Sequence, residues 1–372
     1  MTNSTLIGIT MGCPVGIGPE ITLKFLGSFQ GDDRLQPIVI GDLGVFSHCA
    51  RTLGIEAEII PWQPGDRCKP GAIMICQPPY ADGVFLSPSD LRWGQPSQST
   101  GLVMAAAIEQ TVRLVQSGDL AAMVTCPITK SALHEAGFHF PGHTEMLAAL
   151  CQTSEYAMMM AGGSLKVTLV TIHQSLATVA SALTKEGILR LIDLTGISLI
   201  KDFGVPEPRL VVAGLNPHAG EGGLFGDEEG RVITPAVALA RSRGWQVDGP
   251  LSPDTVFHKA VLGHYDAVIC MYHDQGLIPF KLLHFADGVN VTIGLPIVRT
   301  SVDHGTAYDI AGQGKADPAS LQEAFRMAGE IVSNRQRSKG DGHVQGSGPS
   351  SAMPFDANVR YPLVAKASKV AG

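Results

Sequence analysis

The sequence has few aromatic residues, few charges and no long hydrophobic run. Aromatic residues make up 6% of the 372 residues and charged residues 16%, with a formal net charge of −7 and no basic cluster. We therefore do not expect a nucleic acid as partner, because such binding requires basic surfaces. No window of about 18 uninterrupted apolar residues exists, and the first residues lack a basic segment and a long apolar one. We expect neither a membrane span nor a signal peptide.

The seven cysteines are scattered from Cys13 to Cys270 and form no CxxC pair. A disulfide framework or a thiolate zinc site would need paired or regular spacing. We interpret the cysteines as reduced thiols and expect a cytoplasmic protein. A chain of this length with 45% hydrophobic residues is large enough for two domains.

Short apolar segments alternate with helical patterns along the chain. The expected strands are residues 6–10, 37–41, 72–76, 122–126, 166–172, 210–214 and 267–271. The expected helices are residues 19–29, 99–116, 185–201, 227–243 and 320–332. Because helices separate strands that are apolar nearly throughout, we predict an α/β fold with a mostly parallel sheet covered on both faces.

Two crossing points, Pro141-Gly142 and residues 301–305, divide this pattern into two domains. We expect a discontinuous cofactor-side domain of residues 1–141 and 305–335. Residues 142–304 would form the domain for metal and substrate binding and for dimerisation. Residues 336–372 contain a glycine- and serine-rich stretch that is typical of a linker, and we interpret them as a flexible tail.

Three histidines follow apolar strands: His173, His218 and His273. In parallel sheets, ligands bind beyond the carboxyl ends of the strands, and three imidazoles there make the ligand set of a catalytic zinc site. A single histidine at a strand end is usually an ordinary hydrogen-bonded loop residue, so the hypothesis depends on all three. Asp274, next to His273, is interpreted as a carboxylate that orients the ring.

Polar side chains in two other segments indicate an anion site. His143 and Thr144 open a helical pattern, where free N–H groups and side-chain donors favour phosphate or carboxylate. A plain helix cap is the alternative there, and local sequence favours it. Lys281, Asn290 and Arg299 lie in an apolar stretch, where basic residues either extend to solvent or contact an anion.

Two glycine-containing loops would let a nucleotide approach the backbone. The first, GITMGCPVGIGPE, contains Gly12, and the second, HGTAYDIAGQGKADP, contains His304, Gly305 and Asp309. Neither loop matches a Walker A motif or a strict GxGxxG, so their spacing alone is weak support.

Together these segments resemble the 4-hydroxythreonine-4-phosphate dehydrogenase family, from about residue 5 to residue 335. The resemblance rests on GITMGCPVGIGPE, PGHTEML, GLNPHAGEGGLFGDEE, GPLSPDTVF, MYHDQGLIPFKLL and GVNVTIGLPIVRTSVDHGTAYDIAGQGKADP. It implies two α/β/α domains with a cleft between them, as in isocitrate and isopropylmalate dehydrogenases. It also implies a metal- and NAD-dependent homodimeric enzyme of pyridoxal phosphate biosynthesis, with an active site shared between subunits.

The resemblance assigns roles by position. His173, His218 and His273 match the metal ligands, with the ligand at the position of His273 supplied by the other subunit. One divalent ion per subunit is implied, with Zn²⁺ favoured over Mg²⁺ or Co²⁺. The substrate-binding positions are His143, Thr144, Lys281, Asn290 and Arg299. Asp309 falls where relatives place a carboxylate on the ribose, which favours NAD over NADP.

The implied reaction converts 4-phosphooxy-L-threonine to 3-amino-2-oxopropyl phosphate and CO₂. Lys281 would neutralise a substrate anion, and Asp274, Asp254 and His143 are candidate proton acceptors. The same chemistry on D-threonate or D-erythronate 4-phosphate is an alternative. Further alternatives are a decarboxylating aromatic dihydrodiol dehydrogenase and a redox-silent binding protein. Cys13 stands where the family usually has Asp, which leaves the substrate open.

Overall fold

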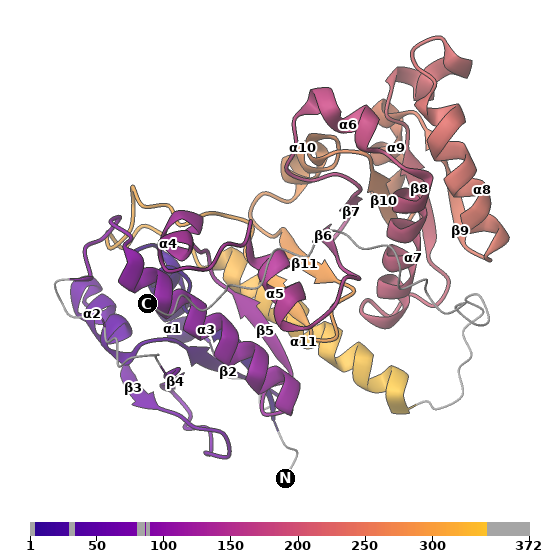
Figure 1. Cartoon of the computed structure of the whole chain (residues 1–372). Helices are drawn as coiled ribbons and strands as arrows, with labels where there is room; N and C mark the ends of the chain where they lie inside the picture. The colour runs from indigo at the N-terminus through magenta and orange to yellow at the C-terminus, as the bar shows by residue number, and fades with distance from the viewer. Residues whose placement is uncertain (1–3, 30–33, 80–85, 87–89, 341–372) are drawn as a thin grey trace, which may run out of the picture.

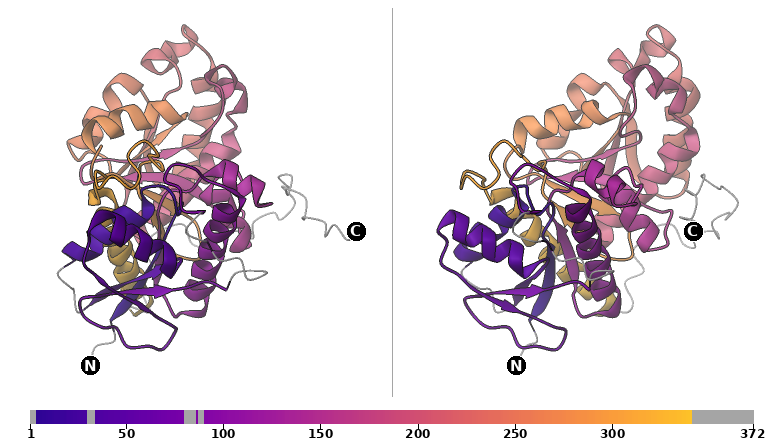
Figure 2. Two further views of the ribbon diagram at one scale, coloured as in Figure 1. Left: turned by 90° about the vertical axis from the view of Figure 1, so that its left-hand side faces the viewer. Right: turned by 60° about the vertical axis from the view of Figure 1, so that its left-hand side comes forward.

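One sheet of 12 strands runs through the molecule in the order β3-β4-β2-β1-β5-β12-β11-β6-β7-β10-β8-β9. The computed structural model describes residues 4–29, 34–79, 86 and 90–340 of the chain. Helices lie on both faces of the sheet, and the ribbon forms two lobes (Figure 1, Figure 2). The predicted α/β class is confirmed.

All seven expected strands are present. They are β1 (Thr5–Thr10), β2 (Leu35–Ile40), β4 (Ala72–Cys76), β5 (Ala122–Thr125), β7 (Lys166–Leu169), β8 (Arg209–Ala213) and β10 (Ala267–Cys270). Five further strands are β3 (Glu58–Pro61), β6 (Ala157–Ala161), β9 (Gln246–Leu251), β11 (Val289–Ile293) and β12 (Arg299–Ser301). Neighbouring strands are parallel, except that β11 is antiparallel to β12 and to β6, and β6 is antiparallel to β7. The sheet is therefore mostly parallel, as predicted.

The five expected helical segments also form. They correspond to α1 (Gly18–Ser28), α3 (Gln98–Ser117), α7 (Lys185–Lys201), the turn η4 (Glu229–Ile233) with α8 (Thr234–Ser242), and α11 (Ala319–Gly340). The remaining helical segments are α2 (Leu43–Leu53), α4 (Lys130–Glu135), α5 (His143–Leu150), α6 (Leu176–Ala182), η3 (Pro217–Gly223), α9 (Pro253–Val261) and α10 (His273–Leu283). In the described part of the chain, no helix has the length and hydrophobicity needed to cross a bilayer.

The core lies on both faces of the sheet because successive strand residues point to opposite sides. Val124 of β5 packs in one hydrophobic cluster with Ile21 of α1 and Leu321 of α11. Its neighbour Met123 packs in the opposite cluster with Met104 of α3. Burial on both faces explains why these strands are apolar throughout. All seven cysteines are free thiols.

The middle of the sheet joins the two lobes. β12 is hydrogen bonded in parallel to β5 and antiparallel to β11. In sequence, β12 falls within residues 142–304, the expected second domain, yet it extends the strands of the first. The sheet is continuous across this boundary, and the division of the chain into two domains stays a prediction.

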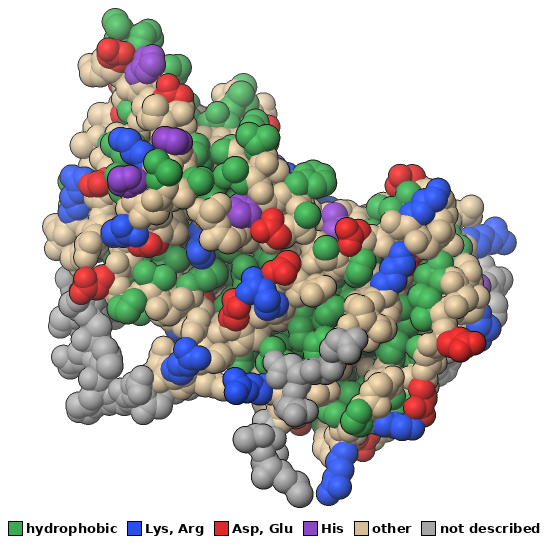
Figure 3. Space-filling view, turned by 180° about the vertical axis from the view of Figure 1, so that it is seen from behind, with side chains coloured by type: hydrophobic (Ala, Val, Ile, Leu, Met, Phe, Trp, Pro, Cys, Tyr) green, Lys and Arg blue, Asp and Glu red, His purple; other side chains and the backbone are tan. Residues whose placement is uncertain are grey.

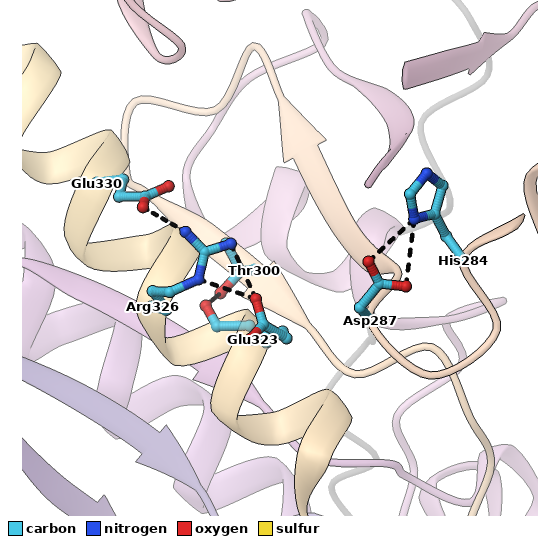
Figure 4. A network of polar contacts seen from close by, with 7 residues as sticks. His284, Asp287, Thr300, Glu323, Arg326 and Glu330 are labelled. Atoms are coloured by element: carbon cyan, nitrogen blue, oxygen red, sulfur yellow. Dashed lines mark hydrogen bonds and ion pairs between the residues drawn. The ribbon is translucent and has the colours of Figure 1, made fainter. Parts of the chain in front are cut away.

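The C-terminal helix α11 is anchored at several points. Thr300 of β12 donates to the carbonyl of Ala324 over 2.7 Å, and Arg326 lies between Glu323 and Glu330 (Figure 4). Near its end, Arg335 Nε lies 2.6 Å from Asp202 Oδ1 of the α7 C-cap. The helix continues to Gly340, so residues 336–340, the first residues of the expected tail, are helical. Residues 341–372 lie outside the described part.

The ion pair between Asp202 and Arg335 is buried, with side chains 4% and 13% exposed. Asp202→Asn is expected to lower the free energy of unfolding by about 3 kcal/mol, because it leaves a buried guanidinium without its counter-charge. Asp227→Asn is a matched control, since its pair with Arg231 is 72% and 58% exposed, and it should cost below about 1 kcal/mol. Urea denaturation measures both. Equal losses in the two variants would contradict the prediction.

Candidate functional site

The three candidate metal ligands come from one edge of the sheet. β7, β10 and β8 are adjacent and parallel, and His173, His273 and His218 each follow one of these strands. The rings of His173 and His273 lie side by side, with centroids 5.8 Å apart. The ring of His218 lies instead near Phe225, at 6.2 Å. Among the described residues, no group of three His, Cys, Asp or Glu side chains is placed to hold a metal ion.

The donor chemistry of the His173 and His273 pair fits a metal. His273 Nδ1 lies 2.7 Å from Asp274 Oδ1, an arrangement in which a carboxylate orients a ligating ring. Burial lowers the pKa of His173, and the charges of Lys130 and His273 lower it further. A neutral imidazole is the form that binds zinc. Asp274 is thus engaged with His273, which favours the orienting role over that of a proton acceptor.

His218 lies in a strained turn. Five consecutive residues, from His218 to Gly222, have positive φ values of 53°, 54°, 78°, 43° and 67°. This left-handed conformation is costly for residues other than glycine, and such strain is concentrated at functional sites. The buried carboxylate of Glu229 holds the turn by accepting hydrogen bonds from the N–H groups of Leu215 and Asn216, each 2.7 Å long. The sequence signal, a glycine-rich NPHAGEGG segment, did not identify Glu229.

Arg299 is buried in the middle of the sheet, with 3% of its surface exposed. Its guanidinium donates to Thr125 Oγ1 over 2.7 Å and to Thr292 Oγ1 over 2.9 Å. Within the described ranges it forms no ion pair. Burial lowers its pKa to about 9, and the charge of Glu145 opposes that shift, so Arg299 is charged at neutral pH. A buried guanidinium whose contacts are hydroxyl groups is prepared to bind an anion.

A row of polar side chains crosses the sheet beside Arg299. Thr10, Thr125, Ser301 and Asn290 are register partners on β1, β5, β12 and β11, so their side chains share one face. Thr10 Oγ1 and Asn290 Oδ1 are buried without a hydrogen-bond partner. Buried polar atoms without partners are rare in folded proteins, so we expect a ligand or an ordered water to complete these bonds.

His143 and Thr144 begin α5, and the structure disfavours the plain helix cap. The N-cap residue is Gly142, and no side chain caps the helix. His143 Nε2 is buried without a partner. Burial lowers the pKa of His143 well below its usual value, and the charge of Arg299 acts in the same direction. The neutral ring and the free N–H groups of α5 therefore lie near the charge of Arg299.

Lys281 forms an ion pair that the sequence did not indicate. Its Nζ lies 3.0 Å from Asp303 Oδ2, and the aspartate is largely buried. Burial raises the pKa of Asp303, while the charge of Lys281 lowers it in part. A substrate anion would compete with Asp303 for this ammonium group. Asp303 directly precedes the HGTAYDIAG loop, which is the one sequence signal that would have found it.

Asp254, a candidate proton acceptor, lies in the first turn of α9. Ser252 Oγ donates a hydrogen bond to its carboxylate over 2.6 Å. α9 packs against η3, which places Asp254 on the side of His218.

The candidate cofactor loop follows β12. Gly305 and Asp309 are exposed, and a Cβ on Gly305 would meet no atom within 4 Å. His304 Nε2 is buried without a partner. Gly12 is buried, and a Cβ there would lie 2.5 Å from the carbonyl oxygen of Pro127. Cys13 is buried too, with its Sγ 3.3 Å from the hydroxyl of Tyr308 in the cofactor loop.

Large apolar side chains are exposed next to the histidines. On and just after α10, Leu282 is 84% and Phe285 80% exposed, and Ile278 and Leu283 are exposed with them. Leu176 of α6 is also exposed. Figure 3 shows histidine and hydrophobic side chains together over the lobe that carries these helices. Exposed apolar groups gathered in this way are typical of a surface that meets another protein.

Comparison with known proteins agrees with this arrangement. The family model described as pyridoxal phosphate biosynthetic protein PdxA matches residues 33–328. A 4-hydroxythreonine-4-phosphate dehydrogenase of Desulfosudis oleivorans is 53% identical over 88% of this chain and 96% of its own length. A D-threonate 4-phosphate dehydrogenase of Salmonella typhimurium is 42% identical over 88% and 98%. The crystal structure of a Klebsiella pneumoniae 4-hydroxythreonine-4-phosphate dehydrogenase, 42% identical, superposes with a TM-score of 0.81 over 89% and 98%.

Arg299→Met should remove an anion site without unfolding the protein. We expect the free energy of unfolding to change by less than about 1 kcal/mol, because losing an unpaired buried charge offsets the lost hydrogen bonds. Inorganic phosphate should raise the melting temperature of the wild type and leave that of Arg299→Met unchanged. Arg113→Met, at an arginine bonded to Gln110 on the exposed side of α3, should keep the response. A phosphate response in Arg299→Met would refute this assignment.

Proposed function

The chain belongs to the PdxA family of pyridoxal phosphate biosynthetic proteins, and we propose that it oxidises and decarboxylates 4-phosphooxy-L-threonine with NAD and a divalent metal. The observation that carries this proposal is the buried charge of Arg299, which forms no ion pair within the described residues, beside unpaired atoms of His143 and Asn290. An anionic group of the substrate would pair with Arg299, and a hydroxyl or ammonium group of the same substrate could donate to Asn290 Oδ1. The relatives named for phosphorylated substrates support the same choice.

The phosphate is proposed to bind between α5 and Arg299. It carries about −1.5 to −2 charges at neutral pH, which the guanidinium and the free N–H groups of α5 would balance. The side chains of His143, Thr144 and Asn290 would supply hydrogen bonds. Lys281 would exchange its contact with Asp303 for a substrate anion. In this account the free enzyme holds the positively charged side chains of Arg299 and Lys281 in place, and the substrate supplies the anionic groups that pair with them.

A metal ion, which we propose to be zinc, would be held by His173, His218 and His273. The rings of His173 and His273 and the carboxylate of Asp274 fit such an ion in donor type. When bound, the ion supplies Lewis-acid polarisation of adjacent substrate oxygens. Asp274 would keep the ring of His273 oriented, and the strained turn held by Glu229 would present His218.

The proposed reaction moves a hydride and a proton from the substrate alcohol. NAD held by the loop of His304, Gly305 and Asp309 would supply the hydride acceptor, and the hydroxyl proton would go to a base, with Asp254 and Lys281 as the proposed catalytic groups. The bond to the carboxylate of the resulting β-keto acid then breaks, CO₂ leaves, and a proton replaces it. NAD would lie on the loop of His304, Gly305 and Asp309, close to the Gly12 turn. The carboxylate of Asp309 would accept from the ribose hydroxyls.

A homodimer would complete the site. One chain brings His173 and His273 together but leaves His218 apart. The exposed apolar side chains on and just after α10, the helix that begins with His273, offer a surface for a second subunit.

D-threonate 4-phosphate is a second candidate substrate. It has the same phosphate and carboxylate, and the Salmonella typhimurium relative named for it matches nearly the whole length of both chains. Cys13, bonded to Tyr308 of the cofactor loop, is a position at which the two activities could be separated.

Substrate identity is tested by NADH formation with zinc-loaded protein. We expect turnover of 4-phosphohydroxythreonine, a lower rate with D-threonate 4-phosphate, and no turnover in Arg299→Met, because the phosphate then lacks its buried partner. The reverse preference would assign the second substrate. No NADH from either compound, with intact metal binding, would reject the proposed activity.

The shared site is tested by co-expressing two inactive variants. His218→Ala with His273→Ala should regain about a quarter of wild-type activity, since half of the dimers are mixed and each has one intact site. Singly expressed variants are the controls, and no recovery would refute a shared site. Co-expression of His173→Ala with His273→Ala regains activity only when these two ligands come from different subunits. That mixture therefore tells whether His273 comes from the same subunit as His173 or from the other one.

A further inference from the structure

An ion pair on α1 holds the end of the loop that carries Asp309. Glu20 is fully buried in the first turn of α1. Lys24 lies one turn later, with its Nζ 2.9 Å from Glu20 Oε1. A buried charge pair is costly unless further hydrogen bonds satisfy both partners. Here those bonds come from the backbone of residues 314–316.

Glu20 and Lys24 together form hydrogen bonds with the backbone N–H and carbonyl groups of Gly314 and Ala316. Glu20 accepts from the N–H of Ala316 over 2.8 Å and from the N–H of Gly314 over 3.3 Å. Lys24 donates to the carbonyls of Gly314 and Ala316, each over 2.7 Å. The two side chains thus act on the loop as a neighbouring strand would. Hydrogen bonds to charged groups are stronger than those between neutral groups.

The rest of the loop is tied to the segment that leads into α1. The N–H of Ile17 donates to the carbonyl of Thr306 over 3.1 Å, and Cys13 contacts Tyr308. Between these ties, Ala307 has a φ of 41°, which an alanine adopts only when its surroundings enforce it. Gln313 donates to the carbonyl of Asp309 over 2.6 Å. The position of Asp309 therefore depends on anchors at both ends of the loop.

We propose that Glu20 and Lys24 are positioning residues that set the affinity for the dinucleotide by fixing this loop. The inference rests on the proposed function, in which the loop carries NAD. Neither residue touches substrate or the reacting atoms. Loss of the pair would let residues 314–316 move, and the ordering of the loop would then oppose cofactor binding.

The test compares Lys24→Met, Lys24→Arg and Glu20→Gln with Lys69→Met. Lys69 is a matched control, because it also pairs with a glutamate, Glu58, but in an exposed ion pair outside this loop. Lys24→Met should raise the Kd for NADH, measured by fluorescence, and the KM for NAD about tenfold, with kcat within about twofold. Lys24→Arg, which can reach both carbonyls, should recover most of the affinity. Glu20→Gln should resemble Lys24→Met, and Lys69→Met should match the wild type.

Hydrogen exchange of Gly314 and Ala316 gives a second measurement. Faster exchange at these amides together with weaker NADH binding supports the proposal. Unchanged NADH affinity in Lys24→Met overturns it while leaving the proposed function intact. A fall in kcat without a change in KM also overturns it, since that would place the pair in the chemical step. Wild-type protein that binds no NADH rejects the cofactor assignment and the proposal together.

Discussion

The site depends on the burial of one positive charge, that of Arg299, in the middle of a continuous sheet. Its strand, β12, lies between β5 and β11, and its guanidinium is held by a threonine from each of them. A charge in this place is costly without a counter-charge. The lobes meet at β12, so an anion that compensates Arg299 would bind where residues from both lobes converge.

Features that cost stability recur among the candidate site residues. The buried atoms without partners include those of His143, Asn290 and His304. Left-handed residues other than glycine occur in the turn of His218 and in the loop at Ala307. Charged side chains stabilise both left-handed segments by hydrogen bonds to the backbone. Glu229 holds the turn, and Glu20 with Lys24 holds the loop. Rigid anchors of this kind allow a site to keep unpaired groups in place before its ligand arrives.

The sequence predicted the strands that are buried on both faces, because these are apolar without interruption. It missed β11 and β12, since Asn290, Thr292, Arg299 and Ser301 give them a polar face that serves the site. The register that aligns Thr10 with Thr125 and Asn290 is a long-range property that no local pattern contains. The ion pair of Lys281 with Asp303 was missed as well, because it joins residues 22 positions apart, which no local helix or strand pattern relates. His173 and His273 follow adjacent strands, so their proximity could be predicted from the sequence. His218 lies apart from these two rings, in a left-handed turn.

In the proposed homodimer, association and metal binding would be linked through α10. This helix begins with His273 and ends in the exposed apolar residues Leu282 and Leu283, so one element presents both a candidate ligand and a candidate interface. If a second subunit supplies part of the ligand set, every contact that stabilises the dimer also stabilises the bound ion, and the ion stabilises the dimer equally. The apparent affinity for metal would then rise with protein concentration, because the complete site exists only in the dimer. A strained turn that keeps His218 apart within one chain is consistent with such coupling, since it prevents a monomer from closing the site alone.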